Sequence, residues 1–399
     1  MSVFHNLLMA AATDAGGTGA GNFSLWSWGT NSSGELADGT TTNRSSPVQV
    51  GALTDWTPNI AANWESVFAI KTDGTLWAWG AGGNFSLGLG IAGAKSSPVQ
   101  VGTASDWYHV GRGNDTGYAI NTSGELYSCG DNHYGQLGLG DSGSDTQRSI
   151  LTQVGSLTNW AGCIGGGQSF AAAVKTDGTS WSWGRGADAQ YFRDSTTTYS
   201  SPVQSGSDTD RWGASSYPPS GGWENGIEMQ KVLTSGYDIT SLIKSDGTLW
   251  AAGDNVLGGI GSAEETASSP VQVGSDTDWE GVSNGMFWGL GIKDGEGLTW
   301  GGYNTYGNLG NGTTSMVIGT QYSWGSTVSQ ASASLNADSS EMQTAMIIGG
   351  ELWVAGKNGR GQLGVGNTTD YSSPVQVGSD DNWVKVVCTG TSMIGIKEE

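Results

Sequence analysis

A short apolar segment that closes on glycine recurs seven times along this chain of 399 residues. The clearest copies read LWSWG at residues 25–29 and LWAWG at residues 76–80. The closing glycines lie 49 to 69 residues apart, at Gly29, Gly80, Gly130, Gly184, Gly253, Gly302 and Gly356. A recurring period of this length indicates a repeat protein, in which each unit buries its hydrophobic face against its neighbours.

Each unit is predicted to contain a hairpin followed by a loop and an outer strand. In the cleanest copy, the β runs 68–71 and 75–80 are joined by Thr72-Asp73-Gly74, and an Asp-Gly pair is the strongest short-range hairpin signal. An Asn-x-x-Gly-x-Leu-Gly loop follows, as at 132–138 and 358–364, and then Ser-Pro-Val-Gln-Val-Gly. Because proline cannot donate to a sheet ladder, we expect five prolines at the start of outer strands: Pro47, Pro98, Pro202, Pro270 and Pro374.

Units of about four short strands that stack radially form a β-propeller. The fold class is therefore predicted to be an all-β, seven-bladed β-propeller. Residues 21–29 carry a second hairpin strand without a first one, whereas 393–397 supply a first strand and then stop. We expect the N- and C-terminal strands to pair and close the ring, with an N-terminal arm and Gly-rich linker at 1–22 and the propeller at 23–399.

The pattern Leu-Trp-x-Trp-Gly-x-Asn-x-x-Gly-x-Leu-Gly, followed by Ser-Pro-Val-Gln-Val-Gly, resembles the regulator of chromosome condensation (RCC1-like) repeat family. The resemblance covers about residues 21 to 399. It implies a seven-bladed propeller. It implies less about activity, since propellers of this family serve nucleotide exchange on small GTPases, protein inhibition, and adhesion or scaffolding.

The composition is strongly acidic, with 16 Lys and Arg against 37 Asp and Glu and a net charge of −21. Such a chain is expected to repel nucleic acid and anionic lipid, because binding to phosphates depends on Lys and Arg. Solubility is the simpler explanation of the charge. Apolar stretches are far shorter than the roughly 20 residues of a membrane span, so no membrane insertion is expected.

Residues for catalysis, cofactors or metals are few, and we predict no catalytic residue, no cofactor and no metal site. The three cysteines, Cys129, Cys163 and Cys388, lack Cys-x-x-Cys spacing and are interpreted as buried packing residues. His133 is expected on a surface turn. The Asp-rich segments 206–210 and 274–278 could hold calcium, but capping of turns explains them better.

Most of the 19 tryptophans recur with the repeat, which favours packing between blades over a carbohydrate-stacking surface. Trp324 is interpreted as a degenerate member of the set that follows Ser-Pro-Val-Gln. Only Trp64, Trp223 and Trp288 fall outside the repeat.

The N-terminal arm combines an apolar tip with a glycine-rich tether at 13–22. Residues 7–12 superficially resemble a signal peptide, but the first Lys or Arg is Arg44, so we expect no cleavable signal. Two interpretations stay open: the arm docks against a partner or a neighbouring subunit, or it covers the propeller itself.

Contacts with partners are expected where the period breaks, because binding residues concentrate on loops. The longest gap contains the insertion 211–224, and 185–199 replaces the usual Asn-x-x-Gly loop just before it. Ordinary divergence within the family is the alternative explanation. The candidate partner-binding residues are Val3, Phe4, Leu7, Leu8, Tyr191, Phe192, Arg193, Arg211, Trp212, Tyr217 and Trp223. The irregular stretch 313–340 is either a decayed outer edge or a further contact loop.

The leading hypothesis is a non-enzymatic structural or protein-binding propeller, a phage virion component attached through its N-terminal arm to other structural proteins of a capsid or tail. The alternatives are a guanine-nucleotide exchange factor for a small GTPase and a secreted-type binder of carbohydrate or protein.

Overall fold

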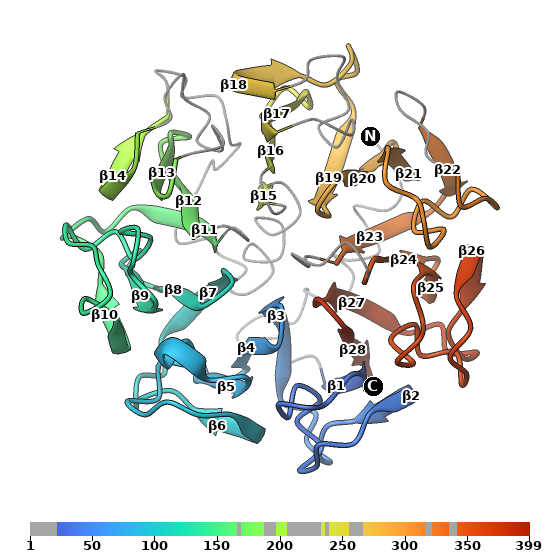
Figure 1. The fold of residues 1–399 in the computed structure, drawn as a ribbon, viewed down its shortest axis with the longest axis horizontal. Helices are drawn as coiled ribbons and strands as arrows, with labels where there is room; N and C mark the ends of the chain where they lie inside the picture. The colour runs from blue at the N-terminus through green and yellow to red at the C-terminus, as the bar shows by residue number, and fades with distance from the viewer. Residues whose placement is uncertain are drawn as a thin grey trace, which may run out of the picture.

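Seven four-stranded antiparallel sheets form the computed structural model, and they are arranged as blades around one axis (Figure 1). The structure describes residues 22–165, 169–186, 197–205, 233–235, 239–254, 266–315, 321–334 and 341–399. The predicted seven-bladed β-propeller is confirmed.

Each blade runs from an inner strand beside the axis to an outer strand at the rim (Figure 1). One short 3-10 helix, η1 (Gly83–Phe85), lies between β5 and β6. From the axis outward, the closing blade, which contains both ends of the chain, consists of β27 (Trp383–Cys388), β28 (Ser392–Glu398), β1 (Phe23–Gly29) and β2 (Arg44–Gln49).

In the same inner-to-outer order, the first blade consists of β3 (Trp56–Asn63), β4 (Ser66–Lys71), β5 (Leu76–Gly80) and β6 (Lys95–Gln100); the second of β7 (Trp107–Arg112), β8 (Thr116–Asn121), β9 (Leu126–Gly130) and β10 (Arg148–Gln153); and the third of β11 (Trp160–Gly165), β12 (Phe170–Lys175), β13 (Ser180–Gly184) and β14 (Tyr199–Gln204). The fourth blade consists of β15 (Leu233–Ser235), β16 (Ile239–Ile243), β17 (Leu249–Asp254) and β18 (Thr266–Gln272); the fifth of β19 (Trp279–Asn284), β20 (Trp288–Lys293), β21 (Glu296–Gly301) and β22 (Tyr322–Gly325); and the sixth of β23 (Val328–Ala333), β24 (Gln343–Ile348), β25 (Glu351–Gly356) and β26 (Tyr371–Gln376).

The hairpin turns form as the Asp-Gly pairs predict. Gly74 has φ of +77°, which only glycine adopts without strain. The Asp73 carboxylate accepts hydrogen bonds from the Thr75 amide at 3.0 Å and from the Thr75 hydroxyl at 2.6 Å, and that hydroxyl accepts one from Trp77 Nε1 at 2.8 Å. The same three hydrogen bonds recur at the turns of Asp177 and Asp246, so the repeated aspartates are explained by hydrogen bonding within the hairpin turns.

The two ends of the chain meet in the closing blade. Strand β1 pairs with β28 over its full length, with Ser24 opposite Lys397 and Trp26 opposite Gly395. Lys397 Nζ lies 4.0 Å from the ring centroid of Trp26 and 4.4 Å from that of Trp383. Lys71 and Lys175 are held between two tryptophans in the same way within single blades. The predicted closure is therefore confirmed, and the closed blade reproduces the packing of the continuous ones.

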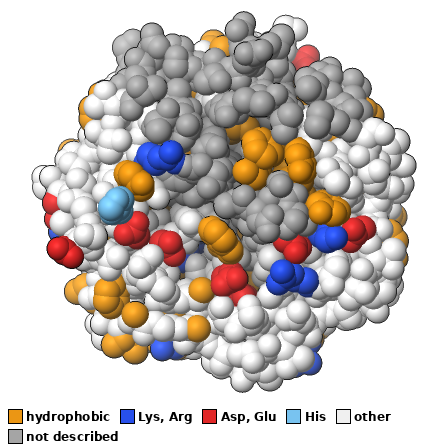
Figure 2. All heavy atoms as spheres, viewed as in Figure 1, with side chains coloured by type: hydrophobic (Ala, Val, Ile, Leu, Met, Phe, Trp, Pro, Cys, Tyr) orange, Lys and Arg blue, Asp and Glu red, His pale blue; other side chains and the backbone are white. Residues whose placement is uncertain are grey.

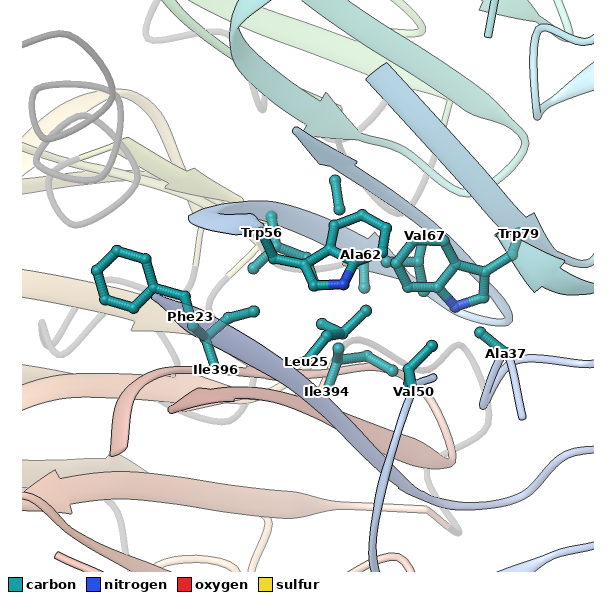
Figure 3. Packing of buried hydrophobic residues seen from close by; sticks show 12 residues of the cluster. Phe23, Leu25, Ala37, Val50, Trp56, Ala62, Val67, Trp79, Ile394 and Ile396 are labelled. Atoms are coloured by element: carbon teal, nitrogen blue, oxygen red, sulfur yellow. The ribbon is translucent and has the colours of Figure 1, made fainter. Parts of the chain in front are cut away.

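The core lies between blades, as the tryptophan pattern predicts. One cluster combines Phe23 and Leu25 with Ile394 and Ile396 of the closing blade and with Trp56 and Trp79 of the first blade (Figure 3). Trp56 and Trp79 meet edge to face, with ring centroids 5.9 Å apart. The equivalent pair of the closing blade, Trp383 and Trp28, has a centroid separation of 5.7 Å.

Inner strands of adjacent blades are linked by hydrogen bonds from polar side chains to backbone. Asn59 donates to the Tyr108 carbonyl, Gln330 Oε1 accepts from the Val386 amide at 3.0 Å, and Ser332 Oγ accepts from the Cys388 amide at 2.9 Å. These contacts pair backbone groups at the free edge of each inner strand, which would otherwise be costly to bury.

Three details differ from the predictions. The repeat prolines lie inside the outer strands rather than at their start: Pro47 is the fourth residue of β2, where a bulge interrupts the pairing with β1 and no amide donor is needed. Trp324 lies in the outer strand β22, not at the start of an inner strand. Its Nε1 donates to the Leu309 carbonyl at 2.9 Å, so it packs on the loop of its own blade. The sixth copy of the repeat closes on Gly301, where β21 ends, rather than on Gly302.

The three cysteines are buried and unpaired, as predicted. Burial raises the pKa of Cys129 and Cys388 to about 12, so these thiols stay protonated and unreactive. Among the described residues, no helix is long and apolar enough to span a membrane.

Candidate functional site

The propeller has two unlike faces. Because strands alternate in direction, connections from inner to second strands and from third to outer strands emerge on one side, which we call the loop face. Its described segments are 30–43, 64–65, 81–94, 113–115, 131–147, 285–287, 302–315, 357–370 and 389–391. The hairpin turns and the connections between blades form the opposite side, the turn face.

Hydrophobic side chains gather near the middle of the loop face, with charged side chains around them (Figure 2). Phe287 and Tyr303 are half-buried and pack with ring centroids 5.8 Å apart. Tyr306 is half-buried beneath Lys357, whose Nζ lies 4.3 Å from the ring centroid. Tyr134 is 40% exposed and lies next to Arg185, 5.9 Å from ring centroid to guanidinium. Aromatic residues, Met and Arg are the types enriched at protein interfaces.

Trp64 is the most unusual residue of this face. It forms the connection between β3 and β4, is half-buried, and has φ of +48°, which is rare for a bulky side chain. Its carbonyl accepts a hydrogen bond from the Gly390 amide of the closing blade at 3.2 Å. A strained backbone of this kind persists only when its surroundings fix it, and such positions concentrate at functional sites.

Carboxylates of the closing, first and second blades are also presented on this face. Ser33 Oγ donates to Glu65 at 3.0 Å, and Gln136 Nε2 donates to Asp131 at 2.7 Å. Burial raises the pKa of Asp115, and the neighbouring Asp131 raises it further, against the Asn84 amide that lowers it. These half-buried acids offer negative charge to an approaching partner.

Arg112 lies beneath these acids and joins the first and second blades. It is 4% exposed, and its guanidinium donates to the Ser86 carbonyl and to the Ser66 hydroxyl. Its Cζ lies 4.6 Å from the ring centroid of Phe68. Burial lowers its pKa to about 10, which still leaves it charged at neutral pH. Its contacts stabilise the seam and keep it away from solvent, so we interpret it as structural.

The loops are held in shape by the asparagine of the Asn-x-x-Gly-x-Leu-Gly motif. Asn358 Oδ1 accepts from the Leu363 amide at 2.9 Å, while its Nδ2 donates to the Asn367 carbonyl at 3.0 Å. Asn31, Asn132 and Asn304 accept from the equivalent amides at 3.0 Å. The loop face is therefore a set of loops fixed on a rigid scaffold.

The residues predicted as partner-binding lie outside the part of the chain that the structure describes, and they stay predictions. Residues 187–196 fall between β13 and β14 in the chain, and residues 206–232 fall between β14 and β15. The residues concerned are Val3, Phe4, Leu7, Leu8, Tyr191, Phe192, Arg193, Arg211, Trp212, Tyr217 and Trp223. The arm at 1–22 is likewise outside, apart from Asn22.

The sequence interpretation missed the central residues of the loop face. Trp64 was recognised as lying outside the repeat, and that irregularity was the available signal. Trp288, the second such residue, is buried, and its Nε1 lies 3.2 Å from Thr344 Oγ1. Phe287 and Tyr303 flank the hairpin of β20 and β21, and the pairing of Trp288 with Gly301 brings them together. Neither residue lies at a fixed position of the repeat motif.

Reactive groups are sparse in the described residues. His133 is exposed on its loop, as predicted, and its ring contacts Tyr134 at 4.7 Å between centroids. His109 is buried, with Nε2 3.0 Å from the Cys163 carbonyl oxygen. No group of three or more His, Cys, Asp or Glu side chains within the described ranges could hold a metal ion.

The repeat has a direct match among protein families. Residues 123–174 and 349–394 match the model described as "Regulator of chromosome condensation (RCC1) repeat". Each matched range runs from a hairpin turn or second strand into the next blade. The chain contains RCC1 repeats. The predicted resemblance is thereby confirmed.

Sequence relatives span most of the propeller. The ultraviolet-B receptor of Arabidopsis thaliana is 28% identical over 353 residues, which cover 85% of this chain and 74% of the receptor. The human E3 ubiquitin-protein ligase HERC2 is 24% identical over 377 residues, which cover 90% of this chain but only 7% of the ligase.

Solved structures share the RCC1 fold at lower identity. Human WBSCR16 has a TM-score of 0.76 at 18% identity, with 94% of this chain and 99% of that one covered. Prp20p from Saccharomyces cerevisiae has a TM-score of 0.75 at 15% identity, with 95% and 92% covered. At such identities the likeness concerns the fold alone.

Proposed function

We propose that this RCC1-repeat propeller is a protein-binding scaffold without catalytic activity of its own, and that it contacts its partner through the loop face. The observation that carries the proposal is the presence of half-buried aromatic residues on this face: Trp64 in the first blade, and Phe287 and Tyr303, which contact each other in the fifth. Such side chains supply contact area at low entropic cost.

The charges of the same face favour a partner with a basic protrusion. Glu65, Asp115 and Asp131 are half-buried carboxylates of the loop face, and complementary charge contributes specificity and association rate. Prp20p, which shares the fold, binds Gsp1p and histones, and yeast RCC1 (Prp20) has been solved bound to Kap60. These complexes support protein binding as the class of function.

The test compares variants of the two faces in the source organism. Tagged wild-type chain, the loop-face variant Trp64→Ala/Phe287→Ala and the turn-face control Leu53→Ala/Leu157→Ala are cross-linked in cells, and co-purified proteins are quantified by mass spectrometry. Leu53 and Leu157 are 54% and 42% exposed, so the control also removes apolar surface. We expect the loop-face variant alone to lose its partners. Equal recovery from both variants would contradict the proposal.

A narrower form of the proposal places the chain in a phage virion, attached to capsid or tail proteins through residues 1–22. Its support is the apolar tip and glycine-rich tether of the sequence together with the low Lys and Arg content. The relatives named above add nothing to it. Deletion of residues 2–20 should abolish incorporation into purified particles, and full occupancy without the arm would refute it.

Nucleotide exchange is the second candidate function, since the fold matches that of Prp20p, which binds Gsp1p. Recombinant Gsp1p loaded with a fluorescent guanine nucleotide is the probe. Accelerated release by the wild-type chain would favour this candidate over a passive scaffold, and an unchanged rate would remove it for this GTPase. Binding of carbohydrate, the third hypothesis from the sequence, is tested by a glycan array.

A further inference from the structure

Glu35 occupies a loop position that is glutamine in two other blades. Gln136 Oε1 accepts a hydrogen bond from the Tyr134 amide at 2.8 Å, and Gln362 Oε1 accepts one from the Arg360 amide at 2.8 Å. Glu35 Oε2 accepts from the Ser33 amide at the same 2.8 Å. One carboxyl oxygen of Glu35 therefore accepts the same hydrogen bond as the amide oxygen of each glutamine, from the backbone amide two residues earlier in the loop.

The other polar atom at the end of the side chain differs: it is Nε2 in the two glutamines and Oε1 in Glu35. Gln136 Nε2 donates to Asp131 at 2.7 Å, and Gln362 Nε2 donates to Glu341 at 2.6 Å, so each amide meets a carboxylate. The remaining oxygen of Glu35, Oε1, lies 3.4 Å from Ser32 Oγ. An ionised carboxylate cannot donate as Nε2 does, whereas a neutral carboxylic acid can.

A second carboxyl group faces Glu35 across the seam between the closing and first blades. Ser33, whose amide binds Glu35, donates its hydroxyl to Glu65 Oε2 at 3.0 Å. Glu35 is fully buried and Glu65 half-buried, so their repulsion is poorly screened. Trp79 of β5 donates its Nε1 to the Glu35 carbonyl at 2.9 Å, which fixes the loop against the first blade.

The cations nearby do not neutralise this pair. Arg44 is ion-paired with Asp38 of the same loop at 2.7 Å, and Lys95 of β6 contributes its backbone where Gly34 packs. Among the ion pairs of the described ranges, none includes Glu35 or Glu65. Burial raises the pKa of Glu35 from its usual 4.5, and the charge of Glu65 raises it further, against the hydrogen bonds from the Ser33 amide and Ser32.

We propose that Glu35 is a proton-binding site in the seam that closes the ring. In its neutral form it replaces the glutamine of the other loops, and its ionisation weakens the contact between the closing and first blades. The proposal goes beyond partner binding and does not depend on it.

The sign of the effect follows from linkage. A carboxyl group with a raised folded-state pKa binds more protons in the folded than in the unfolded protein, so stability falls as pH rises from about 4.5 through the folded-state pKa. Each unit of raised pKa changes the unfolding equilibrium constant by about tenfold over that window.

The test is the pH dependence of unfolding of the full chain, measured by urea denaturation between about pH 4.5 and about pH 8. Glu35→Gln installs the amide that the other loops use. We expect it to match the wild type at the acidic end, to be more stable at the alkaline end by about tenfold in the equilibrium constant for each unit by which the pKa of Glu35 is raised, and to flatten the curve. Parallel curves for the two proteins would overturn the proposal.

Two further measurements keep the result interpretable. Gln136→Glu places a carboxyl group beside Asp131, and it should introduce the same downward slope with pH into a loop that lacks it. Infrared spectra of the wild type should contain a neutral carboxyl band of Glu35 that persists above the range of exposed glutamates and is missing in Glu35→Gln. In Glu65→Gln the same band should disappear at a lower pH than in the wild type, because removal of the second charge lowers the pKa of Glu35. Absence of that band in the wild type would refute the proposal even if Glu35→Gln failed to fold.

Discussion

At the scale of single residues, the loops depend on one buried amide per repeat. Asn358 satisfies the Leu363 amide and donates to Asn367, and the side chain is fully buried. The leucine that follows is buried as well, so the asparagine couples loop shape to the core. The spacing Asn-x-x-Gly-x-Leu-Gly is therefore required by hydrogen bonding as much as by packing.

Asn358→Ala should lower the free energy of unfolding by about 1 to 3 kcal/mol, because it leaves the buried Leu363 amide without an acceptor. Urea denaturation of the wild type and the variant measures the loss. An alanine variant as stable as the wild type would show that the side-chain amide does not hold the loop.

At the scale of elements, the blades are connected by close approach of loop glycines to neighbouring outer strands. Gly361 has φ of +80°, and a Cβ there would lie 2.6 Å from the Cα of Ser45 in β2. Gly34, Gly135 and Gly307 make the equivalent approach to Ser96, Ser200 and Ser372. This explains why a conformationally permissive residue without a side chain recurs at this point of the repeat.

Gly361→Ala should destabilise the protein more than Gly51→Ala. Both positions have positive φ, but a Cβ at Gly51 meets nothing within 4 Å, so Gly51→Ala measures the backbone strain alone. We expect a further cost of about 1 to 3 kcal/mol at Gly361, because the closing blade must shift to relieve the overlap. Thermal unfolding of the two variants gives the comparison, and equal losses would argue against tight packing at this seam.

The element scale also explains what the sequence could predict. Repeated local signals, such as Asp73-Gly74 and the alternating strands around it, predicted hairpins, blade count and closure, since each depends on short-range chemistry that recurs. Trp324 was misplaced because a tryptophan can pack on a loop from the outer strand as well as from the inner one. The contact between Phe287 and Tyr303 follows from the pairing of β20 with β21, but both residues lie at variable positions of the repeat, so the motif did not single them out.

At the scale of the whole molecule, charge is distributed unevenly. On the turn face, lysines at the hairpins are engaged with nearby carboxylates, as in Lys71 with Asp55 at 3.1 Å and Lys293 with Asp276 at 3.1 Å. The net charge of −21 already counts both members of each pair, so 21 acidic groups remain in excess. The folded protein therefore carries self-repulsion, which costs stability while it favours solubility.

Salt should consequently stabilise the propeller. Raising NaCl from about 0.01 M to about 0.1 M shortens the screening length from about 30 Å to about 10 Å, which is less than the width of a small domain. We expect the melting temperature to rise over this range. A melting temperature that falls with salt would mean that favourable ion pairs outweigh the repulsion.

The whole account depends on the head and tail of the chain sharing one blade, because that pairing places every loop of the loop face. Opposed residues of antiparallel strands have Cα atoms about 4.5 to 5.5 Å apart, within the range of about 4.4 to 6.8 Å for a disulfide. The test variant, Ser24→Cys with Lys397→Cys, places two cysteines at such a pair. The matched control is Ser24→Cys with Lys175→Cys, because Lys175 is held between two tryptophans as Lys397 is.

The decisive measurement is peptide mapping of the two double variants after mild oxidation of the folded protein. We predict a disulfide between residues 24 and 397 in the first variant, a higher melting temperature on its formation, and no link between residues 24 and 175 in the control. Absence of the link between 24 and 397, or equal linkage in both variants, would contradict the closed ring.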